Sequence, residues 1–138
     1  MRRLLFIVAL LGLLVSGYLW FIYVGNKEAV LCLDGSGCDK VRTSEYGRIG
    51  GIPTPMFGVA YYTLLALGAI ALTPANVSWM RFPMTLLTGI GLVVSAWFTY
   101  LEAFVIEAWC TWCVVSAILS VIAFVIIWSK LPSYARKY

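Results

Sequence analysis

The sequence predicts an all-α integral membrane protein, a bundle of four transmembrane helices with a short surface helix in the first outer loop. Of its 138 residues, 62% are hydrophobic and only 12% are charged, whereas an ordinary soluble domain is about a quarter charged. A helix needs about 20 apolar residues to cross a bilayer, so four such segments and one polar loop use the whole length. We therefore expect residues 1–138 to form a single domain embedded in a lipid bilayer.

Four apolar segments are long enough to be spans. The first, residues 4–24, is longer than the apolar part of a typical signal peptide and is not followed by a small-residue cleavage pattern, so we interpret it as a retained helix. The polar outer loop follows at residues 25–55. The remaining spans are expected at residues 56–72, 82–100 and 110–128.

The outer loop combines glycines, two cysteines and one segment that can form a helix. Residues 39–46 lack glycine and proline, and Gly47 follows as a helix stop, so the short surface helix is expected there. The glycine-rich residues 32–38 run from Cys32 to Cys38. Either these glycines let a cysteine visit two partners or they simply form a tight turn, and the sequence leaves both interpretations open.

The placement of charge predicts the orientation of the bundle. Four spans put both termini on one side, and that side has no acidic residue and six basic ones: Arg2, Arg3, Arg81, Lys130, Arg136 and Lys137. The other side carries four basic and six acidic residues, which together with the first side recovers the net charge of +4. The positive-inside rule then predicts a multi-pass protein of the cell membrane with both termini in the cytoplasm. The scattered basic residues argue against nucleic-acid binding.

Two of the four cysteines open the fourth span. Residues three apart lie on one face of a helix, so Cys110 and Cys113 can form one disulfide, with Cys110 facing the water and Cys113 facing the lipid. All four cysteines are expected on the outer side, where disulfides form and persist. The chain has no histidine, which removes haem ligation by histidine, most catalytic zinc sites and the usual general base.

Three interpretations of the two cysteine pairs compete: structural disulfides in a membrane scaffold, a four-cysteine zinc site, and a relay of exchanging disulfides. Zinc is disfavoured because five residues separate Cys32 from Cys38, whereas zinc ligands are commonly two to four residues apart, so no metal is expected. A disulfide between Cys110 and Cys113 closes too short a loop to remove much chain entropy, and Cys-x-x-Cys pairs tend to exchange. We favour the relay, with the scaffold as the alternative.

In a relay, the loop pair meets soluble thiols and passes their electrons to Cys110 by thiolate attack through a mixed disulfide. Cys110 is expected at a helix N-terminus, where the helix dipole stabilises a thiolate. Cys113 then faces an acceptor inside the bundle. An acceptor that takes two electrons and dissolves in lipid is a quinone.

Several pieces of the chain resemble the vitamin K epoxide reductase family, in the family's order and over the whole chain. They are Cys32 with Cys38, residues 44–47 (SEYG), 51–53 (GIP), 57–58 (FG) with Tyr61 and Tyr62, and 110–116 (CTWCVVS). The resemblance implies a quinone-dependent thiol:disulfide oxidoreductase whose acceptor is of the menaquinone or ubiquinone type. It also implies a thioredoxin-like or DsbA-like partner, which we expect to act in trans because these 138 residues do not include such a domain. In prokaryotic members the outcome is disulfide formation in exported proteins.

The resemblance assigns roles by position. Cys110 and Cys113 match the pair that reduces the quinone, with Cys113 nearest to it, while Cys32 and Cys38 match the shuttle pair. We favour Cys38 as the contact of the partner and Cys32 as the thiol that attacks Cys110. Four residues are candidates for quinone binding: Phe57, Tyr61, Tyr62 and Ser44. Helix packing explains the aromatic three equally well, and a solvent-facing loop position explains the serine.

Two further observations concern the alternatives. Vertebrate members carry an asparagine and a tyrosine associated with vitamin K binding where this chain has Thr54 and Ala117. Their absence favours a plain quinone as the acceptor, with reduction of vitamin K epoxide as the alternative. Glu102 and Glu107 fall in the expected crossing before the fourth span, where one could assist protonation of the quinone, but a solvated position is favoured. A small multidrug transporter is disfavoured, because it would carry a carboxylate inside a span and none is expected here.

Overall fold

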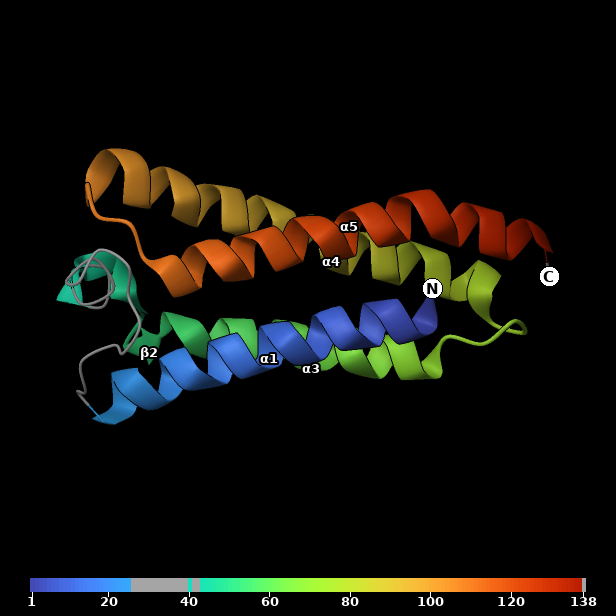
Figure 1. Cartoon of the computed structure of the whole chain (residues 1–138), viewed down its shortest axis with the longest axis horizontal. Coiled ribbons are helices and arrows are strands. Elements are labelled where there is room, and N and C mark those ends of the chain that lie inside the picture. The colour runs from blue at the N-terminus through green and yellow to red at the C-terminus, as the bar shows by residue number, and fades with distance from the viewer. Residues whose placement is uncertain (26–39, 41–42, 138) are drawn as a thin grey trace.

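The predicted membrane bundle is confirmed by a computed structural model, which describes residues 1–25, 40 and 43–137. Four long helices lie side by side in it (Figure 1): α1 (Arg2–Gly25), α3 (Thr54–Ala71), α4 (Val77–Tyr100) and α5 (Thr111–Lys137). α4 runs directly into a π-helix, η2 (Leu101–Val105). Each of the four helical segments is long and apolar enough to cross a membrane.

Two of the spans run further than the sequence suggests. The third begins at Val77 instead of residue 82 and continues through η2 to Val105 instead of ending at residue 100. Asn76 directly precedes it, and its side chain holds the turn from α3 by accepting a hydrogen bond from the Thr73 backbone N–H at 2.8 Å and donating one to the Ala71 carbonyl at 2.8 Å. The fourth helix continues beyond residue 128 to Lys137.

A small hairpin leads from the outer loop into α3. Its strands β1 (Arg48–Ile49) and β2 (Ile52–Pro53) pair antiparallel. The two residues between them, Gly50 and Gly51, have φ angles of +59° and +83°, which glycine adopts without a steric penalty and which two-residue hairpin turns require.

The expected surface helix at residues 39–46 is only partly described. Lys40 and Thr43 are helical, and the 3₁₀ helix η1 (Glu45–Gly47) follows. Residues 39, 41 and 42 lie outside the described residues, as do Cys32 and Cys38. The Thr54 hydroxyl donates to the Tyr46 carbonyl at 2.9 Å, so η1 is tied to the start of α3.

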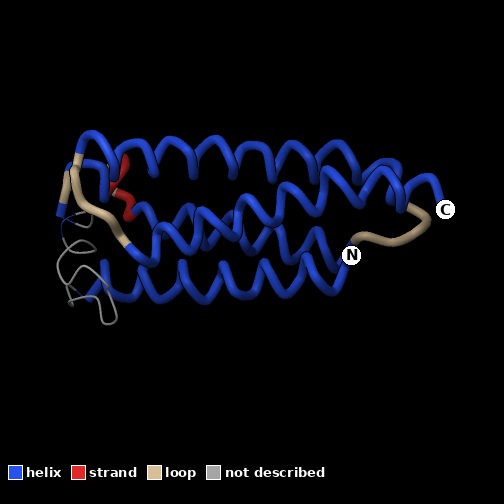
Figure 2. Tube along the Cα trace, turned by 45° about the horizontal axis from the view of Figure 1, so that its top comes forward, coloured by secondary structure: helices blue, strands red, loops and turns tan. Residues whose placement is uncertain are grey.

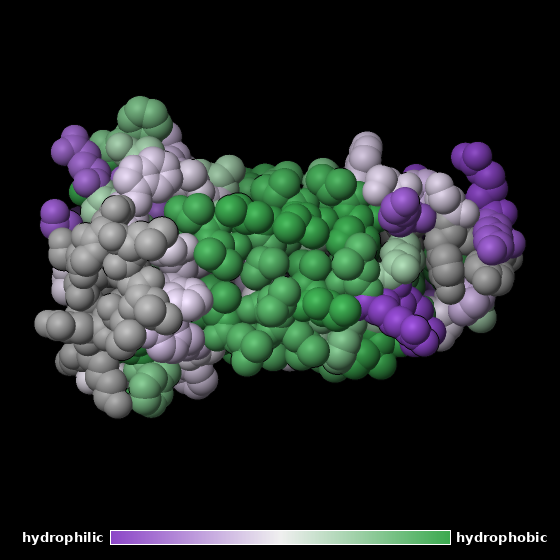
Figure 3. Space-filling view, viewed as in Figure 1, coloured by the Kyte–Doolittle hydropathy of each residue, from purple (hydrophilic) through white to green (hydrophobic). Residues whose placement is uncertain are grey.

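The bundle has two distinct ends. Both termini and the turn between α3 and α4 lie at one, which we call the terminal end. The hairpin, η2 and the start of α5 gather at the opposite end, which we call the cysteine end (Figure 2). Between them, Figure 3 shows a band of apolar side chains. Such a band would be a liability in water, and it is what lipid tails contact in a membrane protein.

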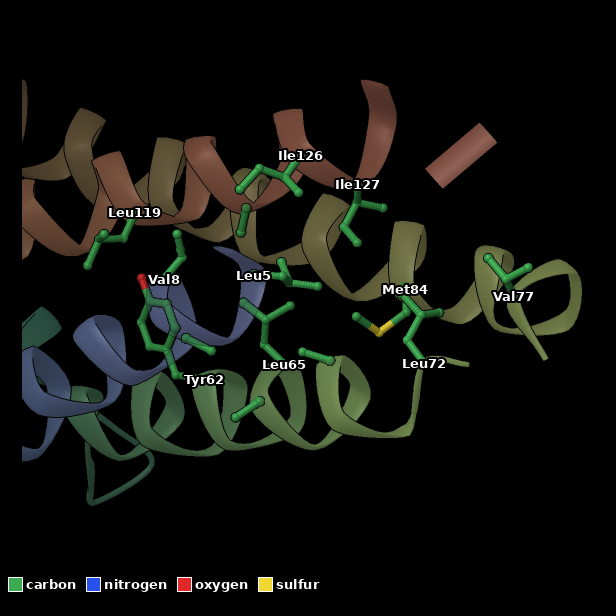
Figure 4. Close-up of a cluster of buried hydrophobic side chains, with 14 residues drawn as sticks. Leu5, Val8, Tyr62, Leu65, Leu72, Val77, Met84, Leu119, Ile126 and Ile127 are labelled. Atoms are coloured by element: carbon green, nitrogen blue, oxygen red, sulfur yellow. The ribbon is translucent and has the colours of Figure 1, made fainter. Parts of the chain in front are cut away.

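The middle of the bundle is filled by one large cluster of buried side chains, which we call the bundle core (Figure 4). It draws on all four long helices: Leu5, Val8, Ala9, Tyr62, Leu65, Ala66, Ala69, Leu72, Val77, Met84, Leu119, Ala123, Ile126 and Ile127. Close approach of α1 and α3 depends on Gly12, where a Cβ would collide with the Tyr62 ring. Small residues allow such close helix packing within membranes.

Candidate active site

The start of α5 places Cys110 and Cys113 one helical turn apart at the cysteine end. Cys110 directly precedes the helix, and its carbonyl accepts a hydrogen bond from the Val114 N–H at 3.0 Å. Its Sγ accepts a second one from the Cys113 N–H at 3.4 Å. The sulfur therefore occupies the position that the oxygen of Ser, Thr or Asp takes in an ordinary N-cap.

This position makes Cys110 the thiolate-prone member of the pair. A hydrogen bond from the Cys113 thiol holds the pKa of Cys110 below its ordinary value, and the backbone N–H groups of Cys113 and Trp112 act in the same direction. Burial and the nearby charge of Glu102 oppose them. A thiolate is the form of cysteine that attacks disulfides, so Cys110 is suited to exchange.

The expectation that Cys110 faces water is wrong, because its side chain is only 1% exposed. It packs in a second, smaller cluster, which we call the thiol cluster, whose buried members are Val15, Leu19, Ala108 and Cys110. Half-buried side chains complete it: Ile106, Trp112, Cys113 and Val115. The cause is the path of the chain between η2 and α5, which folds back against α1 and covers Cys110.

A carboxyl group lies buried beside the two thiols. Glu102 is 3% exposed, and its Oε2 accepts a hydrogen bond from the Cys110 N–H at 3.3 Å. Its carboxyl also lies within reach of the Cys113 thiol, whose single hydrogen can be donated either to this carboxyl or to Cys110 Sγ. The expectation of a solvated carboxylate is therefore wrong for Glu102, whereas Glu107 is exposed.

Glu102 also belongs to the third span, which reaches Val105. This helix is longer than the roughly 20 residues that a bilayer requires, so Glu102 stands near its outer end, where a buried carboxyl group faces the two thiols. The sequence did hold a signal: Leu101 and residues 103–106 (AFVI) are apolar, so the apolar run of the third span continues on both sides of Glu102.

The two tyrosines predicted as quinone contacts lie deeper in the bundle. Tyr62 is 1% exposed, and its hydroxyl donates to the Ser116 carbonyl at 2.7 Å, with Ser120 Oγ at 3.2 Å. It therefore connects α3 to α5, one turn after Cys113. The Tyr61 ring packs over Gly91 of α4. Its buried hydroxyl makes no hydrogen bond in the described part of the chain, although Ser120 lies near it.

The other two candidates lie nearer the cysteine end. Phe57 is in the first turn of α3 and is 47% exposed. Ser44 is half-buried just before η1. The described contacts bring Tyr61 and Tyr62 together, with ring centroids 4.9 Å apart, but they do not join Phe57 or Ser44 to this pair.

Two grooves lie away from the thiols. One, of about 500 Å³, is apolar and runs along α4 against Phe124. The other, of about 530 Å³, lies near the terminal end and includes Arg81 and Trp128. Within residues 1–25, 40 and 43–137, no group of three or more Cys, Asp or Glu side chains is arranged to hold a metal ion. The four-cysteine zinc alternative needs Cys32 and Cys38, which lie outside the described residues.

A comparison with known families settles the ancestry of the chain. The model of the Vitamin K epoxide reductase family matches residues 3–128. The chain belongs to the vitamin K epoxide reductase family. The resemblance carried by the cysteine spacing and the short motifs is thus confirmed, and the protein is a multi-pass membrane helical bundle of this family.

A named relative is the thiol-disulfide oxidoreductase LTO1 of Arabidopsis thaliana. It is 27% identical to this chain over 115 residues, which cover 78% of this chain and 31% of the relative. The chain thus spans about a third of the length of this relative. Residues 3–128, which the family model matches, contain all four cysteines of this chain.

Proposed function

We propose that this chain is a membrane thiol oxidoreductase that passes electrons from a thioredoxin-like partner, through Cys32 and Cys38 and then Cys110 and Cys113, to a membrane quinone. The observation that carries the proposal is the pair at the start of α5. There, a thiolate-prone Cys110 lies one turn from Cys113, inside a cluster of apolar side chains. The family membership and the named oxidoreductase relative support it.

The electron path follows from disulfide exchange. The Cys32 thiolate attacks Cys110 Sγ of the oxidised membrane pair, and Cys113 leaves as a thiolate. Cys38 then attacks Cys32, which releases Cys110 and leaves the loop pair oxidised until the partner reduces it again. Reoxidation of Cys110 and Cys113 to a disulfide releases two electrons and two protons, which the quinone takes up as it becomes a quinol.

The surroundings of the thiols fit an apolar acceptor. The side chains that pack against Cys110 are Val15, Leu19 and Ala108, and they offer van der Waals contact to a hydrophobic ring but no cation for a charged one. Cys113 is half-buried beside them. Because these groups are buried, a quinone would reach the pair from the exposed side of Cys113 and would accept electrons there.

The proposed outcome is disulfide formation in exported proteins. It requires the cysteine end to face outwards and both termini to face the cytoplasm. The basic side chains of the terminal end, among them Arg2, Arg81 and Lys130, support this orientation by the positive-inside rule.

The test is to mix the purified protein with a reduced thioredoxin-like protein and a soluble quinone and to follow quinone absorbance. We expect absorbance to fall only when all four cysteines are present. Cys113→Ser should abolish the reaction while leaving the thermal unfolding midpoint in detergent nearly unchanged. A scaffold with structural disulfides predicts the reverse: no consumption of quinone by the unmodified protein and a lower midpoint for the variant.

A further inference from the structure

Glu102 is the one acidic side chain that is buried in the described part of the chain. Burial of a carboxyl group is costly unless hydrogen bonds or a paired charge compensate for it. No Lys or Arg of the described residues forms an ion pair with it. Its described partners are the Cys110 N–H and the Cys113 thiol. The compensation for this buried group therefore comes from the two reactive cysteines themselves.

The backbone before α5 is built to hold Glu102 in that place. In η2 the Ile106 N–H donates to the Leu101 carbonyl at 2.7 Å, a π-helical bond, and such π-turns are frequent at functional sites. Glu107 then adopts a φ of +56°, and the Ala108 N–H donates to the Glu102 carbonyl at 3.1 Å. These bonds turn the chain back, so that residue 110 lies over residue 102.

We propose that Glu102 is a catalytic acid–base residue of this site, which takes the proton of the Cys113 thiol and passes it to the reduced acceptor. The proposal rests on the function proposed above. As the disulfide forms, the S–H bond of Cys113 breaks and an O–H bond forms on Glu102. That O–H bond breaks when the proton moves to an oxygen of the acceptor, which regenerates the carboxylate. The second proton comes from the Cys110 thiol, or from water where Cys110 is already a thiolate.

The other described charged groups of the cysteine end are poorly placed for this role. Lys40, Glu45, Arg48 and Glu107 are all exposed. Histidine, the most common acid–base side chain, is absent from the chain. Among the described residues, Glu102 alone combines a titratable oxygen with contact to both cysteines.

Glu102→Gln tests the role with little change in shape, because the glutamine oxygen can still accept a hydrogen bond from the Cys110 N–H but cannot take a proton. We expect the rate of quinone reduction by the full chain to fall roughly a hundredfold, within the usual range for loss of an acid–base group. Glu107→Gln, which removes the same charge from an exposed position nearby, should stay within about twofold of the unmodified protein.

A second readout separates chemistry from structure. The charge of Glu102 raises the pKa of Cys110, so its removal should make Cys110 react faster with iodoacetamide at a fixed pH, as measured by mass spectrometry. Alkylation that speeds up while turnover falls is the expected signature. A merely structural role would slow both or leave both unchanged. Glu102→Asp keeps the carboxyl group and should retain at least a tenth of the original rate of quinone reduction. This variant also tests the role if Glu102→Gln does not fold.

Turnover of Glu102→Gln within about threefold of the unmodified protein at every pH would overturn the acid–base role while leaving the proposed function intact. Failure of the unmodified protein to consume quinone would instead contradict the proposed function itself. In that case an unchanged alkylation profile for Glu102→Gln would also overturn the contact between Glu102 and the thiols.

Discussion

The two buried clusters of this bundle differ in what they bury. The bundle core joins all four long helices through fourteen buried residues, and the buried hydroxyl of Tyr62 within it is hydrogen-bonded to α5. The thiol cluster buries only four residues, one of them Cys110, and lies against the buried carboxyl of Glu102. Polar groups inside membrane bundles are expensive and tend to mark functional sites. The side chains that pack the bundle and the groups suited to chemistry thus lie at different places along the length of the molecule.

The largest effect should come from Cys110→Ser in the thiol cluster. Serine cannot form a disulfide, so quinone reduction should become undetectable. Its oxygen can still accept the hydrogen bond from the Cys113 N–H, so thermal unfolding in detergent should change little. Cys110→Ala should be equally inactive and less stable by about 1 kcal/mol, because it also loses the N-cap. Residual turnover by the serine variant would break the assignment of chemistry to this cluster.

Gly12→Ala should lower the stability of the bundle core without changing the chemistry of the thiols. The added methyl group collides with the Tyr62 ring, and overpacking of this kind costs about 1–3 kcal/mol. The unfolding midpoint should fall while the alkylation of Cys110 keeps its pH dependence. Gly17→Ala in the same helix is the control, since a Cβ there meets nothing within 4 Å. Equal midpoints for the two variants would contradict the close approach of α1 and α3.

Cys113→Ala tests how much the Cys113 thiol contributes to the lowered pKa of Cys110. The thiol of Cys113 lowers the pKa of Cys110, so its loss should raise that pKa and move the midpoint of the alkylation rate of Cys110 to higher pH. Mass spectrometry after timed alkylation gives the midpoint. Cys113→Ser retains a hydroxyl donor and should show a smaller shift. A midpoint that stays in place in both variants would mean that the backbone N–H groups alone stabilise the thiolate.

Tyr62→Phe should have the smallest effect. It removes the hydrogen bonds to Ser116 and Ser120, which is worth about 1 kcal/mol in a membrane bundle. If the tyrosine only packs the core, the rate of turnover should stay within about twofold of that of the unmodified protein. A change of that size is too small to indicate the loss of a contact with the transition state. A much larger fall in turnover with an unchanged unfolding midpoint would instead identify Tyr62 as a contact of the acceptor and would break the separation between the clusters.

The sequence was sufficient for the class of fold because hydropathy alone determines it. Apolar runs of about 20 residues are the signature of membrane helices, and the Cys-x-x-Cys at the start of the last run predicts which end of the bundle carries the chemistry. The family was also within reach, because Cys110-x-x-Cys113 and the loop motifs occur in a fixed order. These signals are local and need no knowledge of how the helices pack.

The surroundings of the thiols could not be obtained in the same way. A single glutamate after Tyr100 looks like the end of a span, and only the backbone turn through η2 and Glu107 reveals that Glu102 is folded inwards. The burial of Cys110 depends on Val15 and Leu19, almost a hundred residues earlier in the chain. Long-range contacts of this kind leave no periodic pattern in the sequence.

The sulfur that begins α5 has a consequence for the helix itself. In the reduced protein Cys110 Sγ accepts a hydrogen bond from the Cys113 N–H, whereas a disulfide sulfur carries no negative charge and is a weaker acceptor than a thiolate. Each round of the proposed exchange would therefore weaken and restore the first turn of the last helix. The backbone N–H of Cys113 should therefore exchange its hydrogen for deuterium faster in the disulfide form of the protein than in the reduced form.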